Sequence, residues 1–112
     1  MPQQDDKQAL IGLNKAELPT PALLIDLDIL ESNIAKMSAH AKAVGIKLRP
    51  HAKSHKCPEI AKRQIAAGAV GVCAATISEA EALANAGING LLITSPMAGR
   101  DKTARLVKLT HL

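Results

Sequence analysis

The fold is decided by the stretch IAAGAVGVCAATISEAEALANAGINGLLI, which occupies residues 65–93. Twice in this stretch, at 65–72 and at 83–92, the end of a helix-like segment passes through a turn of small residues and glycine into a short apolar run. Strands that alternate with helices in this way are joined by right-handed crossovers and form a parallel sheet. The stretch therefore predicts the α/β class.

The same pattern continues on both sides of that stretch. Upstream, AKAVGIKL (41–48) again leads from a helix end into an apolar run, and Gly45 supplies the helix stop. The helix before it is predicted from an apolar stripe at helical spacing, formed by Leu30, Ile34, Met37, Ala41 and Val44. Downstream, GRDKTARLVKL (99–109) predicts a last helix.

Local signals predict where the elements begin. The prolines of LPTP (18–21) disfavour helical backbone in the residue before each of them, and the apolar run ALLIDL (22–27) that follows has the length of a strand. Three helix starts are predicted, at Asp28 with Glu31, at Pro58 with Glu59, and at Ser78 with Glu81. A helix is therefore expected after each of the first three predicted strands.

Chain length limits the architecture. A closed (β/α)8 barrel needs about 250 residues, whereas this chain has 112 and supplies three or four predicted strands. We therefore predict the first βα units of a (β/α)8 barrel, incomplete in this chain, over residues 18–112, after a polar and unpatterned N-terminal tail at 1–17. A small but complete α/β domain is the alternative.

The composition narrows the function classes. The chain has no Phe, Tyr or Trp, and single-stranded nucleic acids are usually bound by stacking bases on such rings, so no nucleic-acid partner is predicted. A net charge of +4 without a dense basic run agrees with a small anionic ligand. Two cysteines are too few for a secreted disulfide framework, and no signal peptide or membrane span is apparent, so we expect a soluble cytoplasmic protein.

The segment KLRPHAKSHK (47–56) concentrates cationic side chains. If it forms a strand, the two-residue period places Arg49, His51 and Lys53 on one face, and Lys56 has the wrong parity to join them. One interpretation is a basic strand end that faces water. The other makes Lys53 a reactive amine near the C-terminal end of a strand, where α/β barrels keep their chemistry. Neighbouring cations would favour the neutral amine that attacks a carbonyl.

Two other uses of this segment remain open. A metal could be bound by His51 and His55, but their spacing suits a zinc site only on a helix, and Cys57 with Glu59 does not complete a known ligand pattern. A non-enzymatic module could instead bind a phosphate ligand through the basic face. No metal-ligating residue is predicted.

Two segments of the chain resemble a known enzyme family. They are LPTPALLIDLDILESNIAKM (18–37) and LRPHAKSHKCPEIAKRQIAAGAVGVCAATISEAEALANAGI (48–88). Together they are similar to the N-terminal part of the D-threonine aldolase and D-serine dehydratase family, which consists of fold type III pyridoxal-phosphate enzymes with an alanine racemase-like barrel. The resemblance covers about residues 18–100. It implies that residues 18–112 are the N-terminal part of such a cofactor-binding barrel domain.

The resemblance also assigns residues and a reaction. It implies that Lys53 holds pyridoxal 5'-phosphate as a Schiff base, and that His51 and Arg49 belong to the cofactor site. The implied substrate is a small D-amino acid with a β-hydroxyl group. Retro-aldol cleavage to glycine and an aldehyde, as in a D-threonine aldolase, is the reaction that we expect, and deamination of the D-serine dehydratase type is the alternative.

Other parts of the implied enzyme are expected outside this chain. Members of the family continue through the remaining barrel strands, whose loops hold the cofactor phosphate, into a C-terminal β-domain that carries the ligands of a divalent metal. We therefore expect this chain alone to be a fragment with little or no turnover. A homodimer is the assembly that the resemblance suggests for the full-length form.

Overall fold

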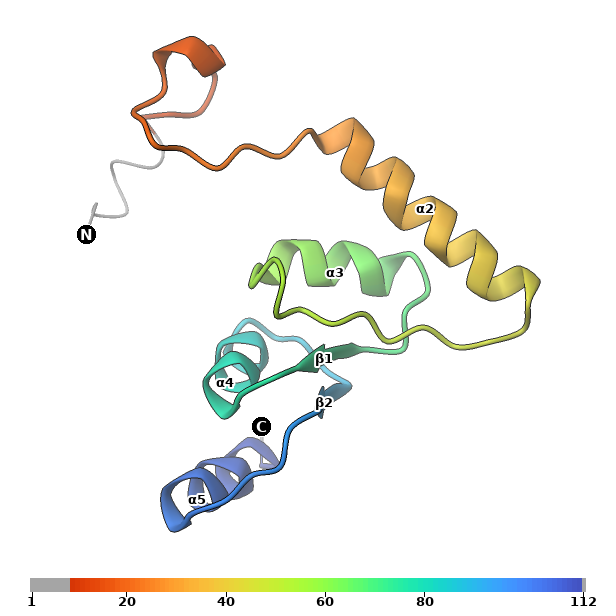
Figure 1. The fold of residues 1–112 in the computed structure, drawn as a ribbon, viewed down its shortest axis with the longest axis vertical. Coiled ribbons are helices and arrows are strands. Elements are labelled where there is room, and N and C mark those ends of the chain that lie inside the picture. The colour runs from red at the N-terminus through yellow and green to blue at the C-terminus, as the bar shows by residue number, and fades with distance from the viewer. Residues whose placement is uncertain (1–8, 112) are drawn as a thin grey trace.

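The computed structural model describes residues 9–111, and Figure 1 shows how the elements are arranged. In chain order they are the 3-10 helix η1 (Lys15–Glu17), α2 (Leu27–Ala43), α3 (Pro58–Ala66), β1 (Val72–Ala74), α4 (Ile77–Asn85), β2 (Leu91–Ile93) and α5 (Arg100–Leu109). Over this described range, no helix combines the length and the apolar character that crossing a membrane requires.

A small parallel sheet lies at the centre of the fold. Strands β1 and β2 pair in parallel, with Val72 opposite Leu91 and Ala74 opposite Ile93, and α4 makes the crossover between them. Both strands and this helix lie within residues 65–93. The α/β class predicted from that stretch is therefore confirmed.

A third segment, 48–52, extends the sheet on the other side of β1. The N–H of Cys73 donates to the carbonyl of Pro50 at 2.7 Å, and the carbonyl of Cys73 accepts the N–H of Ala52 at 2.8 Å. His51 and Cys73 are bridged in parallel. The predicted strand is confirmed only in this short ladder, because Pro50 has no N–H to donate and the chain turns after Ala52.

The core is built from small aliphatic side chains. One cluster of buried residues joins the end of the third segment, α3, β1, α4 and the turn after α4, and consists of Ala52, Ala61, Val72, Ala74, Ala80, Leu83 and Ile88. Val72 and Ala74 enter it from the same face of β1, since they are two residues apart on a strand. Because the chain has no Phe, Tyr or Trp, the packing depends on the close approach that alanine allows.

Helix α2 is confirmed but begins earlier than predicted. Its N-cap is Asp26, whose carboxylate accepts the N–H of Ile29 at 3.0 Å. Asp28, the predicted cap, lies in the first turn, where a negative charge still favours the N-terminus of a helix. The predicted stop is confirmed, because the helix ends at Ala43 and Gly45 has a positive φ of 71°.

Helix α4 also begins before its predicted cap. The N-cap is Thr76, whose hydroxyl accepts the N–H of Glu79 at 3.2 Å. Ser78 and Glu81, the predicted capping box, both lie inside the helix and bind Arg105 of α5. The helix itself is confirmed, and its predicted cap is wrong because the sequence offers two overlapping Ser/Thr-x-x-Glu patterns.

The predicted strand at 22–27 is wrong. Residues 22–26 form an irregular connection, and Leu27 is already the first residue of α2. Leu23 on this connection is 94% exposed, and Figure 1 shows that the connection approaches α2 far from β1 and β2. A strand needs a neighbour whose N–H and C=O groups pair with its own, and apolar composition alone does not supply one.

The predicted tail at 1–17 is covered only in part, since residues 1–8 lie outside the described range. From residue 9 onward the chain is not unpatterned, because η1 carries a complete capping box. The side chain of Asn14 accepts the N–H of Ala16 at 3.1 Å, and the carboxylate of Glu17 accepts the N–H of Asn14 at 2.8 Å. The boundary between tail and domain stays a prediction.

Candidate functional site

The candidate site is the turn formed by residues 52–56, which follows the short parallel ladder at its C-terminal end. A hydrogen bond from the N–H of Lys56 to the carbonyl of Ala52, at 2.8 Å, closes the turn. Lys56 has a positive φ of 48°, which is uncommon for a residue other than glycine. Lys53 therefore lies in a turn and not on a strand, contrary to the prediction.

Lys53 is an exposed side chain of this turn. In the part of the chain that the structure describes, its amine makes no hydrogen bond or ion pair, whereas the amine of Lys56 binds the carboxylate of Glu79 at 2.5 Å. The two lysines of the motif therefore differ, since Glu79 binds the amine of Lys56 and no described residue binds the amine of Lys53. This contrast supports Lys53 as the reactive amine on grounds independent of strand periodicity.

His51 joins the turn to the C-terminal end of β2. Its Nδ1 accepts the backbone N–H of Lys53 at 3.2 Å, and its Nε2 lies 3.1 Å from the hydroxyl of Thr94, which donates in turn to the carbonyl of Ala74 at 3.3 Å. Because Nδ1 accepts, the ring proton in this arrangement is on Nε2 and points to Thr94. His51 therefore links the turn to the residue that follows β2.

Arg49 reaches the other end of β2. Its guanidinium donates to the carbonyl of Gly90, which directly precedes β2, whereas His51 reaches Thr94 directly after β2. Arg49 and His51, two residues apart, thus both reach residues that flank β2, and only Lys53, in the turn, departs from the predicted strand face. The contact that the structure shows for Arg49 is with backbone, and its part in binding a cofactor stays a prediction.

Glu79 and Thr94 complete the surroundings of the turn, and the sequence patterns did not single them out. The side chain of Glu79 is 15% exposed, and its carboxylate also accepts the N–H of Ala75 at 2.8 Å. The hydrogen bond from Lys56, and after it that from Ala75, lowers the pKa of Glu79. The available signals were the Thr-x-x-Glu pattern at 76–79 and the position of Thr94 directly after an apolar strand.

His55 lies on the inner side of the same turn. Its Nδ1 accepts the N–H of Cys57 at 3.0 Å. Its Nε2 and the Oε1 atom of Gln64 are both buried, and neither has a hydrogen-bond partner among the described residues. Burial lowers the pKa of His55, and the neighbouring Gln64 and Cys57 oppose this only in part. The folded state therefore favours the neutral imidazole.

This burial predicts an acid-sensitive stability. Unfolded His55 titrates near its ordinary pKa of about 6.5, and its pKa in the folded state is lower. At pH values between these two pKa values, the unfolded chain binds more protons than the folded chain. The contribution of His55 to the free energy of unfolding is therefore complete above about pH 6.5 and is lost as the pH falls toward the folded pKa. The free energy of unfolding of the wild type should fall as the pH is lowered from about 7.5 to about 5.5. We expect this fall to be smaller in His55→Asn.

Chemical denaturation at the two pH values measures this effect. The matched control is His111→Asn, because His111 is exposed and distant in sequence. The control should keep the wild-type decline. An equal decline in wild type and His55→Asn would show that His55 does not couple protonation to folding.

A zinc site at His51 and His55 would need both residues on one helix, and neither of them lies on a helix. His51 lies in the parallel ladder and His55 in the turn, and the Nδ1 atom of each ring accepts a backbone N–H. Between residues 9 and 111, no three side chains of His, Cys, Asp or Glu come together as a possible metal site.

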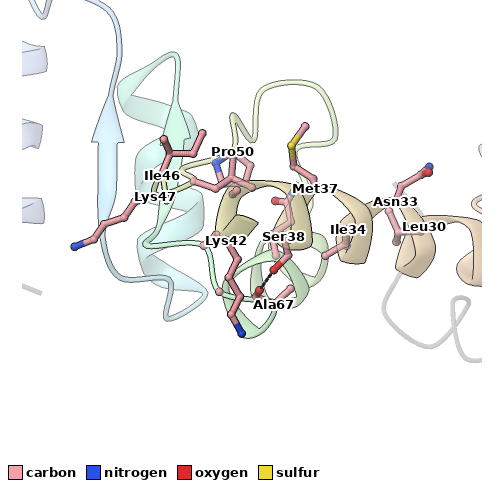
Figure 2. Close-up of a pocket in the computed structure, with 15 residues that line it drawn as sticks. Leu30, Asn33, Ile34, Met37, Ser38, Lys42, Ile46, Lys47, Pro50 and Ala67 are labelled. Carbon is pink, nitrogen blue, oxygen red and sulfur yellow. Dashed lines mark hydrogen bonds between the residues drawn. The ribbon is translucent and has the colours of Figure 1, made fainter. Parts of the chain in front are cut away.

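A separate apolar groove of about 790 Å³ lies between α2, the segment 46–50 and the end of α3. Figure 2 shows that Leu30, Ile34 and Met37 line it from α2, and that the hydroxyl of Ser38 bridges to the carbonyl of Ala67 beside it. Neither the turn 52–56 nor its partners Glu79 and Thr94 line this groove. It is therefore distinct from the candidate site.

Comparison with known proteins gives a consistent picture over most of the chain. Residues 25–111 match the family model of the alanine racemase N-terminal domain. The 3-hydroxy-D-aspartate aldolase of Paracoccus denitrificans is 45% identical over 105 residues, which are 93% of this chain and 27% of that protein. The chain thus spans about a quarter of the length of this curated relative.

Solved structures agree with the sequence match. The crystal structure of D-threonine aldolase from Filomicrobium marinum has a TM-score of 0.83 at 52% identity, over 85% of this chain and 26% of that one. D-threo-3-hydroxyaspartate dehydratase from Delftia sp. HT23 has a TM-score of 0.79 at 39% identity, over 85% and 25%. A variant of a dehydratase with the same name is described in a metal-free form.

Proposed function

Because the chain belongs to the family of the alanine racemase N-terminal domain, we propose that it supplies the first βα units of a (β/α)8 barrel in a pyridoxal-phosphate-dependent lyase. The observation that carries this proposal is the free amine of Lys53. It stands in a turn at the C-terminal end of a parallel ladder, which is the end where such barrels keep their chemistry.

The residues of the turn fit the aldehyde end of this cofactor. Among the described residues the exposed amine of Lys53 has no counter-ion; His51 accepts the backbone N–H of Lys53, and Glu79 binds the side-chain amine of Lys56 at the end of the turn. Lys53 would hold the cofactor covalently, and His51 would orient Lys53 through the bond to its backbone N–H. When bound, the cofactor supplies an electron sink for charge that develops at the substrate Cα. The phosphate would be held by residues of the remaining barrel.

The proposed substrate is a D-amino acid with a hydroxyl group on Cβ. The names of the three relatives above share this feature, and two of them are aldolases. We therefore propose retro-aldol cleavage to glycine and an aldehyde as the reaction of the whole enzyme. Dehydration is the second candidate, and the 39% identity to the dehydratase favours it next. The chain alone is expected to turn over little or no substrate.

Reductive labelling tests the proposal. The chain is incubated with pyridoxal 5'-phosphate, reduced with borohydride, and analysed by intact mass and peptide mapping. We expect one pyridoxyl group, placed on Lys53 in preference to the other exposed lysines. The same labelling in denaturant gives the intrinsic reactivity of every lysine and serves as the control. A label spread over the folded chain as in denaturant would contradict the proposal.

A further inference from the structure

Glu79 connects two loops that are far apart in the sequence. Its carboxylate accepts the amine of Lys56 at 2.5 Å, across 23 positions of the chain, and the N–H of Ala75 at 2.8 Å. Ala75 directly follows β1, and Lys56 closes the turn that carries Lys53. One side chain therefore ties the turn to the end of the central strand.

The two partners contribute unequally to this link. The side chain of Glu79 is 15% exposed and that of Lys56 is 66% exposed. Glu79 stands in the first turn of α4, and its own N–H is bound by the Thr76 cap, so the carboxylate is presented from a rigid element. Charge-assisted hydrogen bonds of this kind are stronger than neutral ones. Lys56 is thus the more exposed partner, and Glu79 presents the carboxylate that binds it.

The backbone of Lys56 explains why the turn needs such a link. Its φ of 48° lies in the left-handed region, which side chains other than glycine adopt at an energetic cost and keep only when their surroundings hold them there. Glu79 captures the amine of that same residue. On the other flank, His51 binds the N–H of Lys53 and the hydroxyl of Thr94. The turn is therefore held at both ends, while the Lys53 amine stays free between them.

We propose that Glu79 is a positioning residue, which fixes the turn 52–56 through Lys56 and so sets the direction in which Lys53 is presented. The inference rests on the proposed function for the use of Lys53. The order of the turn itself can be measured without any cofactor.

Glu79→Gln is the informative substitution. Glutamine keeps the size of the side chain and an oxygen that can accept the N–H of Ala75, but it removes the charge that holds Lys56. Loss of a hydrogen bond between charged groups should speed hydrogen exchange of the amides at 52–56 by about ten-fold or more. The preference of pyridoxyl labelling for Lys53 should fall toward its value in denaturant.

Glu81→Gln is the matched control. Glu81 lies on the same helix and is also paired, with Arg105 at 2.5 Å, but it does not touch the turn. The hydrogen bonds from Arg105 lower the pKa of Glu81, as Lys56 does for Glu79, so both substitutions remove a carboxylate held by a cation. The control should leave exchange at 52–56 and the labelling preference unchanged. Lys56→Arg, which keeps a cation for Glu79, should also preserve both.

Hydrogen exchange decides this inference and labelling decides the proposed function. Exchange at 52–56 that is equal in wild type and Glu79→Gln would overturn the inference, whatever the labelling shows. A wild-type chain without preference for Lys53 would overturn the proposed function, and exchange would still decide whether Glu79 holds the turn. Should Glu79→Gln lose its helical circular dichroism, Lys56→Met removes the same link from its exposed side and is measured in its place.

Discussion

Lys53→Ala is expected to abolish the preferential pyridoxyl label and with it any absorbance from covalently bound cofactor. The reason is chemical, because the amine is the only group of that side chain able to condense with an aldehyde, and alanine has none. The fold should survive, since Lys53 is exposed and its amine makes no hydrogen bond or ion pair within the described residues. Intact mass after borohydride reduction, with peptide mapping, measures the loss directly.

Two further substitutions separate covalent from ionic binding. Lys47→Ala removes another exposed lysine of the same segment and should leave the label on Lys53 in place. Lys53→Arg keeps the positive charge but replaces the amine by a guanidinium that stays protonated, so it should lose the label as alanine does. If Lys53→Arg bound the cofactor as tightly as the wild type, the chain would be a non-covalent phosphate-binding module, and the lyase proposal would fail.

Residues 65–93 could be interpreted correctly from sequence because their signals are local. Glycine turns, apolar runs and helix starts within a few residues of one another all favour the same structure, and β1, α4 and β2 all form within this stretch in the predicted order. Cap positions were harder. Asp26 and Asp28 are both suitable caps for α2, and Thr76 and Ser78 are both suitable caps for α4. In each pair the first residue is the cap, because its backbone is extended there.

The strand predicted at 22–27 failed for a different reason. Strand formation depends on a partner that comes from elsewhere in the chain, and the composition of the segment says nothing about where that partner lies. Pro50 shows the same limit on a smaller scale. Its missing N–H could be foreseen, but the turn after Ala52 depends on a ladder with Cys73 that only the structure reveals.

The sequence predicts Lys53 as the reactive amine on the premise of a strand that aligns it with Arg49 and His51. Lys53 lies instead in the turn that follows the ladder, whereas Arg49 and His51 both reach residues that flank β2. It remains the best candidate because its amine is free while that of Lys56 is paired. The residues that organise the turn could not be inferred from spacing, since Glu79 and Thr94 reach it across 23 and 43 positions of the chain.

Gly71→Ala is expected to be the most destabilising single substitution among the glycines. Gly71 has a φ of 147°, and an added Cβ would overlap the carbonyl oxygen of Gly90 and lie 2.8 Å from its carbonyl carbon. It would also lie 2.5 Å from the guanidinium nitrogen with which Arg49 binds Gly90. Because most of these atoms are backbone, no side-chain rotation can relieve the clash. We expect a loss of at least about 3 kcal/mol in the free energy of unfolding.

Gly87→Ala separates this steric effect from backbone strain. Gly87 also has a positive φ, of 80°, but an added Cβ there would meet no atom within 4 Å. Gly87→Ala should lower the free energy of unfolding by only about 1 kcal/mol. Denaturant unfolding measures the loss in both variants, and the difference between the two losses gives the steric contribution at Gly71. Equal losses would mean that β1 and β2 can separate at their N-terminal ends without penalty.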